Sequence, residues 1–135
     1  MRELADGRTV ELTDRYSMVF SVGRDVLLFT WHEVGELAVE EYKDAIRAIA
    51  ARAVALKPSV LVIDRRQFRA NVAFDMYPWW SREILPMYHQ AGIARFAHIT
   101  GDPDAAGQYA EALEGVEFEM GEFTDLQQAV DWAVA

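Results

Sequence analysis

The segment of the sequence most suggestive of chemistry is a basic cluster, Arg-Arg-Gln-Phe-Arg, which contains Arg65, Arg66 and Arg69. The cluster directly follows Val60–Asp64, an apolar run of β-branched type that is typical of a strand covered on both faces. In α/β folds the loops after such strands bind anions, because backbone N–H groups and helix dipoles converge there. The three guanidinium groups could therefore recognise a phosphate or a carboxylate. The alternative is that they pair with some of the 22 acidic side chains of the chain.

Asp64, at the end of the apolar run, occupies a position where doubly wound enzymes often place a catalytic carboxylate. It could equally accept hydrogen bonds from loop amides or pair with Arg65 or Arg66. The chain has no cysteine, P-loop, nucleophile elbow or glycine-rich dinucleotide motif. Its histidines share no metal-ligand spacing: His32, His89 and His98. We therefore expect a protein that is not an enzyme and requires no metal or cofactor. A hydrolase that uses Asp64 with a histidine is the less favoured alternative.

A second candidate region is the aromatic segment Asp75–Gly92. At about 100° per residue, one apolar stripe of a helix gathers Tyr77, Trp80, Ile84, Met87, Tyr88 and Ala91. These residues are expected to be core. Asp75 is the expected N-cap, and Pro78 falls in the first turn, where its missing N–H leaves no helical bond unmade. Pro86 lies two turns further on and should kink or end the helix.

Trp79 does not fit the apolar stripe, because it points nearly opposite with Arg82, Pro86 and Gln90. Exposing a tryptophan forgoes about 2–3 kcal/mol of burial, so another group should cover it. A neighbouring helix or the N-terminal segment is one possibility. A second copy of the chain, a protein partner or an apolar ligand is the other. We therefore predict an interface or pocket at Trp79, Arg82, Pro86 and His89, with Trp79 meeting a group outside its own domain.

The segments that must position these residues alternate between strand and helix patterns. Strands are predicted around 9–12, 16–22, 26–32, 60–64, 95–100 and 116–120. Helices are predicted over 39–57, 75–92 and 102–115, and a last one should open at Thr124, which has capping-box spacing to Gln127. This order predicts one α/β domain over residues 1–135, with an antiparallel start followed by βα units.

Composition limits the classes of partner. The net charge of −9 and the pI near 4.7 argue against nucleic acid or an anionic membrane surface as the main partner. No apolar run is long enough to span a membrane, and the first residues carry no apolar core of a signal peptide. These features predict a cytoplasmic protein.

The order of elements and several local phrases resemble the SpoIIAA-like (STAS-type) domains of small bacterial proteins. The matching phrases are "FTWHE" with "VEEYKDAI", "LVIDRRQF", "WWSREILPMYHQAGIARFAHIT" and "FTDLQQAVDWA". The best-known members of that family are anti-sigma-factor antagonists, which are switched by phosphorylation of a serine near the start of the helix after the "LVID"-like strand. This chain departs from that pattern, because it has no serine or threonine between Val60 and Trp80.

The resemblance implies a regulatory or interaction module, here without the phosphorylation switch, whose partner is a protein or a second copy of the chain as a homodimer. Other SpoIIAA-like proteins are grouped with lipid-transfer domains. The alternative function is therefore a carrier or sensor of a small amphipathic or lipid-like ligand, with an apolar pocket and an anion site formed by Arg65, Arg66, Arg69 and Asp64.

Overall fold

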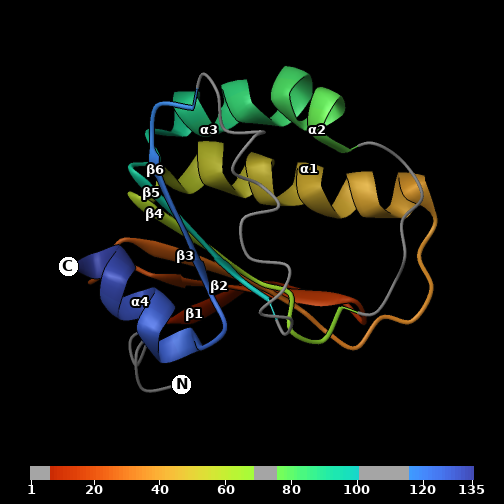
Figure 1. Ribbon diagram of the computed structural model, residues 1–135, viewed down its shortest axis with the longest axis horizontal. Coiled ribbons are helices and arrows are strands. Elements are labelled where there is room, and N and C mark those ends of the chain that lie inside the picture. The colour runs from red at the N-terminus through yellow and green to blue at the C-terminus, as the bar shows by residue number, and fades with distance from the viewer. Residues whose placement is uncertain (1–6, 69–75, 101–115) are drawn as a thin grey trace.

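A computed structural model describes residues 7–68, 76–100 and 116–135 (Figure 1). Within these residues, six strands form one mixed sheet, and they lie side by side in their order along the chain. They are β1 (Arg8–Leu12), β2 (Tyr16–Ser21), β3 (Val26–Trp31), β4 (Val60–Asp64), β5 (Arg95–Ile99) and β6 (Glu119–Phe123). The first three strands are antiparallel and β3 to β6 are parallel, so the predicted α/β class with an antiparallel start is confirmed.

Helices cover both faces of this sheet. One face carries α1 (Val39–Leu56) and a continuous helical segment made of α2 (Met76–Trp79), the π-helix η2 (Trp80–Ile84) and α3 (Leu85–Ala91). The other face carries α4 (Leu126–Val134), which packs on β4, β5 and β6. Figure 1 shows α1, α2 and α3 above the sheet and α4 below it.

Each face has its own hydrophobic layer, because successive residues of a strand point to opposite sides. In β4, for example, Leu61 and Ile63 pack under α1 and α3, whereas Val60 and Val62 pack against α4. All four side chains are buried, which explains the continuous apolar run in the sequence.

Helix α1 follows its predicted apolar periodicity and ends where the sequence indicates. Tyr42, Ile46, Ile49 and Ala53 are buried along one stripe. Lys57 then adopts a left-handed conformation (φ 51°) and its N–H bonds to the carbonyl of Ala53. The proline at position 58 prevents further helix.

The last predicted strand and helix are displaced from their predicted positions. β6 spans Glu119–Phe123, not 116–120, because pairing with β5 begins where Glu119 faces Arg95. The predicted alternation of apolar and acidic residues is confirmed, since Phe118 is buried and Met120 packs against the same core. Asp125, not Thr124, is the N-cap of α4, and its carboxylate accepts from the Gln128 N–H at 3.0 Å. The helix predicted over 102–115 lies outside the described residues.

Arg95 fixes the far end of α4 to the sheet. Its Nη1 atom donates to the carbonyl oxygens of Trp132 and Ala135 at 2.8 and 2.9 Å, and its Nε donates to Glu119 at 3.1 Å. A cation at a helix C-terminus is favoured by the helix dipole. The last helix is therefore held at its start by its own Asp125 and at its end by a residue of β5.

Candidate functional site

Buried polar residues collect at one edge of the sheet. Because β3 to β6 are parallel, their carboxyl ends meet at the same edge, where α/β proteins usually place their sites. Asp64 ends β4 and is 5% exposed, and His98 and Thr100 lie at the end of β5 with exposures of 8% and 9%. Within the described ranges, only Ser21 is a further buried polar residue. Buried polar groups are more informative about function than exposed ones.

The sheet divides these polar residues between its two faces. Asp64 follows the alternation of Val60 and Val62 and therefore projects toward the α4 face. His98 alternates with Ala97 and Ile99, which pack on the α4 side, and therefore projects toward the α1 face. Asp64 and His98 consequently lie on opposite sides of the sheet and cannot act together on one substrate atom.

The carboxylate of Asp64 forms an ion pair with the guanidinium of Arg66. The Arg66 backbone N–H and Nε donate to Asp64 Oδ1 at 3.1 and 3.0 Å, and Nη2 donates to Oδ2 at 2.7 Å. The hydrogen bond with Asp64 raises the pKa of Arg66, and the nearby charge of Asp125 adds to this effect. The bidentate pair is thus a structural clamp that fixes the loop after β4, and the pairing alternative holds for these two residues.

Substituting Asp64 by asparagine should lower stability by about 1–2 kcal/mol, because the buried side chain loses a charge-assisted bidentate pair. The Arg66 side chain is 38% exposed, so water partly compensates the loss. Urea unfolding of the variant measures this cost, with Asp14→Asn on the exposed β1–β2 turn as the matched control. An unchanged unfolding midpoint for Asp64→Asn would contradict the clamp.

Arg65 lies on the other face and joins an aromatic cluster. Its guanidinium carbon is 5.2 Å from the ring centroid of Phe68, a cation–π distance. The Phe68 ring lies 4.7 Å from Trp31 and 6.0 Å from Tyr42, which in turn stack on each other at 6.0 Å. Phe68 is placed there by a parallel bridge to Val34, which extends the pairing of β3 and β4 beyond their ends. We name Trp31, Tyr42 and Phe68 the aromatic cluster.

His98 lies on the same face as the aromatic cluster. Burial, together with the smaller effect of the positive charge of Arg65, lowers the pKa of His98 to about 3. The imidazole is therefore neutral at physiological pH. The aromatic cluster, the cation of Arg65 and a neutral imidazole make this edge apolar with one positive charge.

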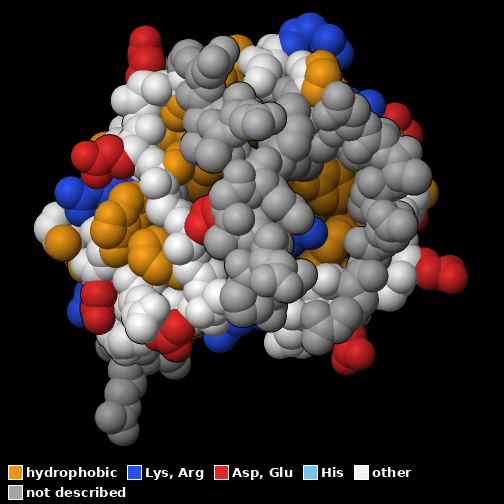
Figure 2. Space-filling model, viewed as in Figure 1, with side chains coloured by type: hydrophobic (Ala, Val, Ile, Leu, Met, Phe, Trp, Pro, Cys, Tyr) orange, Lys and Arg blue, Asp and Glu red, His pale blue; other side chains and the backbone are white. Residues whose placement is uncertain are grey.

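Hydrophobic side chains gather in this region. Figure 2 shows orange hydrophobic side chains and a blue basic side chain in an opening between the atoms drawn in grey. The described hydrophobic residues that pack together here include Trp31, Val34, Leu37, Tyr42 and Phe68. We call this apolar cluster, together with Arg65, the recess, and it is the candidate functional site.

The predicted three-arginine anion site is not formed as one cluster. Arg65 and Arg66 are separated by the sheet, because consecutive residues after a strand leave toward opposite faces. Arg66 is bound to Asp64, so it belongs to the clamp and not to the recess. Arg69 lies outside the described residues. Of the three predicted arginines, Arg65 is the one that the described residues place beside the aromatic cluster.

Trp79 is buried within its own chain, and the prediction that it meets an outside partner is wrong. It is 6% exposed and Trp80 is 9% exposed. The π-helix explains how neighbouring tryptophans are both buried: the Leu85 N–H bonds to the Trp80 carbonyl five residues earlier, as in a π turn. This spacing places Trp79 in line with Ile84, and Trp80 in line with Leu85. A regular helix would have directed one of the two rings outward.

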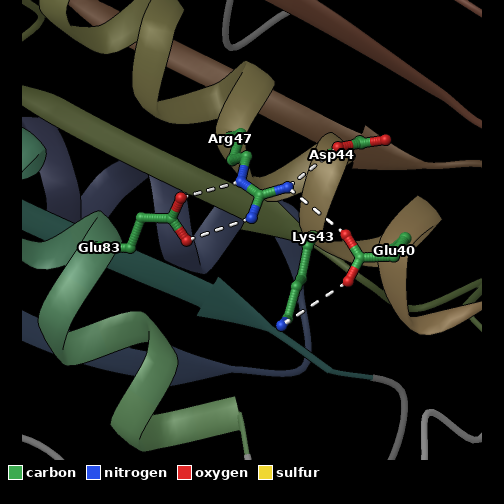
Figure 3. A network of polar contacts seen from close by, with 5 residues as sticks. All are labelled: Glu40, Lys43, Asp44, Arg47 and Glu83. Carbon is green, nitrogen blue, oxygen red and sulfur yellow. Dashed lines mark hydrogen bonds and ion pairs between the residues drawn. The ribbon is translucent and has the colours of Figure 1, made fainter.

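Charged residues of α1 cover the outer side of Trp79. Lys43 and Arg47 lie 5.4 and 5.6 Å from its ring, and Glu83 of η2 holds Arg47 in place at 3.0 Å. Figure 3 shows Arg47 between Glu83 on one side and Asp44 and Glu40 on the other. The neighbouring helix α1 thus covers Trp79, which is the first of the two possibilities that the sequence left open.

The other predicted interface residues do not form one site either. Arg82 and Pro86 are exposed on the outer side of the helical segment. Pro86 does not end the helix, because it falls in the first turn of α3, where the preceding π turn has already altered the bonding. His89 lies in the last turn of α3 and contacts the segment before β6.

Sequence reasoning missed the aromatic members of the recess. Trp31, Tyr42 and Phe68 are distant in sequence. The parallel pairing of β3 with β4 and the packing of α1 on the sheet bring them together. One signal was available, because Phe68 stands in the same short loop as Arg65. In the ranges 7–68, 76–100 and 116–135, no helix could cross a membrane, and no group of three or more potential metal ligands is found.

The architecture is that of a SpoIIAA-like fold, as the resemblance predicted. A similar solved structure is that of an uncharacterised protein of the DUF3478 family from Shewanella loihica, described as having a SpoIIAA-like fold. The similarity covers 94% of this chain and 91% of that chain, with 20% sequence identity and a TM-score of 0.55. No protein-family model and no curated protein matches the sequence. At this identity the likeness defines the fold, and function must be argued from the residues.

Proposed function

We propose that the protein is a non-catalytic binding module for a small amphipathic ligand that carries an anionic group. The observation that carries this proposal is the aromatic cluster at the carboxyl edge with Arg65 across the face of Phe68. Ligand sites are typically apolar recesses with a few placed polar groups that fix orientation. The aromatic rings would hold the apolar part, and the guanidinium would bind a carboxylate, sulfonate or phosphate.

Three features favour binding over catalysis. The Asp64 carboxylate is held by Arg66, so it does not face a substrate as a free base. His98 is buried and neutral, and its lowered pKa makes it a weak base. Asp64 and His98 project to opposite faces of the sheet, so these two residues do not form a catalytic dyad. The interpretation as a dimerisation module rested on Trp79, whose burial removes that support.

Paired fluorescent probes can test the anionic part of the proposal. The first probe is 8-anilinonaphthalene-1-sulfonate, and the second is N-phenyl-1-naphthylamine, which has the same ring skeleton without the sulfonate. We expect both to bind the folded protein saturably. Arg65→Gln should weaken the sulfonate probe by about tenfold, since one charge-assisted contact is lost, and should leave the neutral probe unchanged.

The matched control is Arg24→Gln, which removes an exposed arginine from the β2–β3 turn. Its affinity for both probes should stay within about twofold of the original. Circular dichroism and the melting temperature confirm that each variant is folded, because these probes also bind partly unfolded states. Absence of saturable binding, or an equal effect of the two arginine substitutions, would refute the proposal.

A further inference from the structure

The segment before β6 is attached to α3 through a histidine that acts as a hydrogen-bond acceptor. We call residues 116–118 the β6 lead-in. The backbone N–H of Glu117 donates to Nε2 of His89 at 3.2 Å. A ring nitrogen can accept this bond only when it carries no proton, so the contact defines the neutral form of His89 with its proton on Nδ1.

The bond holds a core residue in position. Phe118 directly follows Glu117, is 8% exposed, and lies with its ring 5.7 Å from that of His89 in an edge-to-face arrangement. The same phenylalanine contacts Phe96 of β5 at 6.1 Å and Tyr88 of α3 at 6.4 Å. The lead-in is therefore docked by the packing of Val116 and Phe118 on the core and by the Glu117 hydrogen bond. The Phe118 ring and the hydrogen bond both meet His89.

From these contacts we propose that His89 is a pH-sensitive latch. In its neutral form it holds the β6 lead-in against α3, and on protonation it releases the Glu117 amide. Protonated imidazole is a donor at both nitrogens, so Nε2–H would face the N–H of Glu117 in place of a lone pair. Histidine is the side chain that ordinarily changes charge between pH 5 and pH 8.

Two features near His89 interact with a positive charge on its ring. His89 is in the last turn of α3, where the helix dipole stabilises a cation. The other residues of α3 carry no charge. In the lead-in, Glu117 is the one charged residue, and its carboxylate attracts an imidazolium. The next acidic residue, Glu119, is bound to Arg95 at 3.1 Å. Protonation therefore removes the hydrogen bond from the Glu117 amide and leaves the attraction between the imidazolium and the Glu117 carboxylate.

The direction of the pH effect follows directly. The bond is present at pH values where imidazole is neutral and is lost as the pH falls. Its loss removes one of the contacts that hold the lead-in before β6, which is an edge strand among the described strands. The proposal is independent of ligand binding in the recess, because the latch lies at the opposite, amino edge of the parallel strands.

Amide exchange and NMR titration of the full chain test the latch. Between pH 8 and pH 5, the exchange protection of Glu117, corrected for intrinsic rates, should fall about three- to tenfold, as expected for one hydrogen bond. The Glu117 amide shift should titrate with the same midpoint as the ring carbons of His89. In His89→Gln, whose side-chain oxygen accepts a bond without titrating, the Glu117 shift and protection should become independent of pH in this range.

The matched control is His32→Gln, which removes a histidine near the end of β3. The Glu117 response should persist in that variant. If the ring of His89 titrates in the original chain and the Glu117 amide does not respond, the latch is refuted. A pH response of Glu117 that survives in His89→Gln would assign it to another group and refute the proposal equally.

Discussion

Trp80→Ala should reduce the free energy of unfolding by about 3–5 kcal/mol, the range for a large buried aromatic residue replaced by alanine. The Trp80 ring packs edge-to-face on fully buried Tyr88 at 5.9 Å, under the α1 face of the core. Trp79→Ala should also destabilise the isolated chain, by about 2–4 kcal/mol, because its ring is buried and carries Lys43 and Arg47 on its outer side.

Urea unfolding followed by circular dichroism measures both costs. Pro86→Ala is the matched control, because Pro86 lies in the same helical segment and is exposed. It should change stability far less than either tryptophan substitution. A Trp79→Ala variant that keeps full stability while altering the oligomeric state would show that Trp79 serves an interface after all.

Acidification should destabilise the protein through His98. Its pKa is about 3 in the folded state, against an ordinary value of 6.5, because burial opposes the charged form. Below pH 6.5 the unfolded chain therefore binds a proton that the folded chain does not bind. The contribution of neutral His98 to the free energy of unfolding is complete above pH 6.5 and is lost progressively as the pH falls toward 3. The loss is about 1.4 kcal/mol per pH unit within this window, so roughly 2 kcal/mol disappears between pH 6.5 and pH 5.

His98→Leu separates this effect from all other titrations. Leucine is neutral at every pH, so the difference in stability between the original chain and the variant should shrink by about that amount from pH 7 to pH 5. The measurement is the urea midpoint and slope at several pH values, with His32→Gln as a control that keeps the pH dependence. A constant difference between the original chain and His98→Leu across this range would contradict a buried neutral imidazole.

Local sequence pattern was sufficient for most of the fold. The apolar run Val60–Asp64 and the stripe of Tyr42, Ile46 and Ile49 specify a buried strand and an amphipathic helix without reference to distant residues. Such periodicities follow directly from the repeat of each structure, 2 for a strand and about 3.6 for a helix. The displacement of β6 by three residues shows the limit, because strand bounds depend on the partner strand.

The π turn could not be predicted from local pattern. A regular repeat of about 100° per residue places Trp79 and Trp80 on different sides, and one wide turn brings both inward. The separation of Arg65 from Arg66 was predictable in principle, since the period of 2 continues past the end of β4. The pairing of Asp64 with Arg66 was one of the predicted alternatives. The contacts of Phe68 with Trp31 and Tyr42 could not be predicted, because a strand, a helix and a loop far apart in sequence meet at this edge.

The described strands have the same order in the sheet as along the chain, and this order affects how the chain can fold during translation. As the chain leaves the ribosome, each new strand can add to the edge of the strand made just before it, so no strand must insert between two that are already paired. Chains that pair neighbouring segments close shorter loops and fold faster. The α4 face is the exception. The helix α4 covers a hydrophobic layer on this face, which includes Val60, Val62, Ala97 and Ile99. During translation this layer therefore stays accessible to chaperones until α4 has been synthesised.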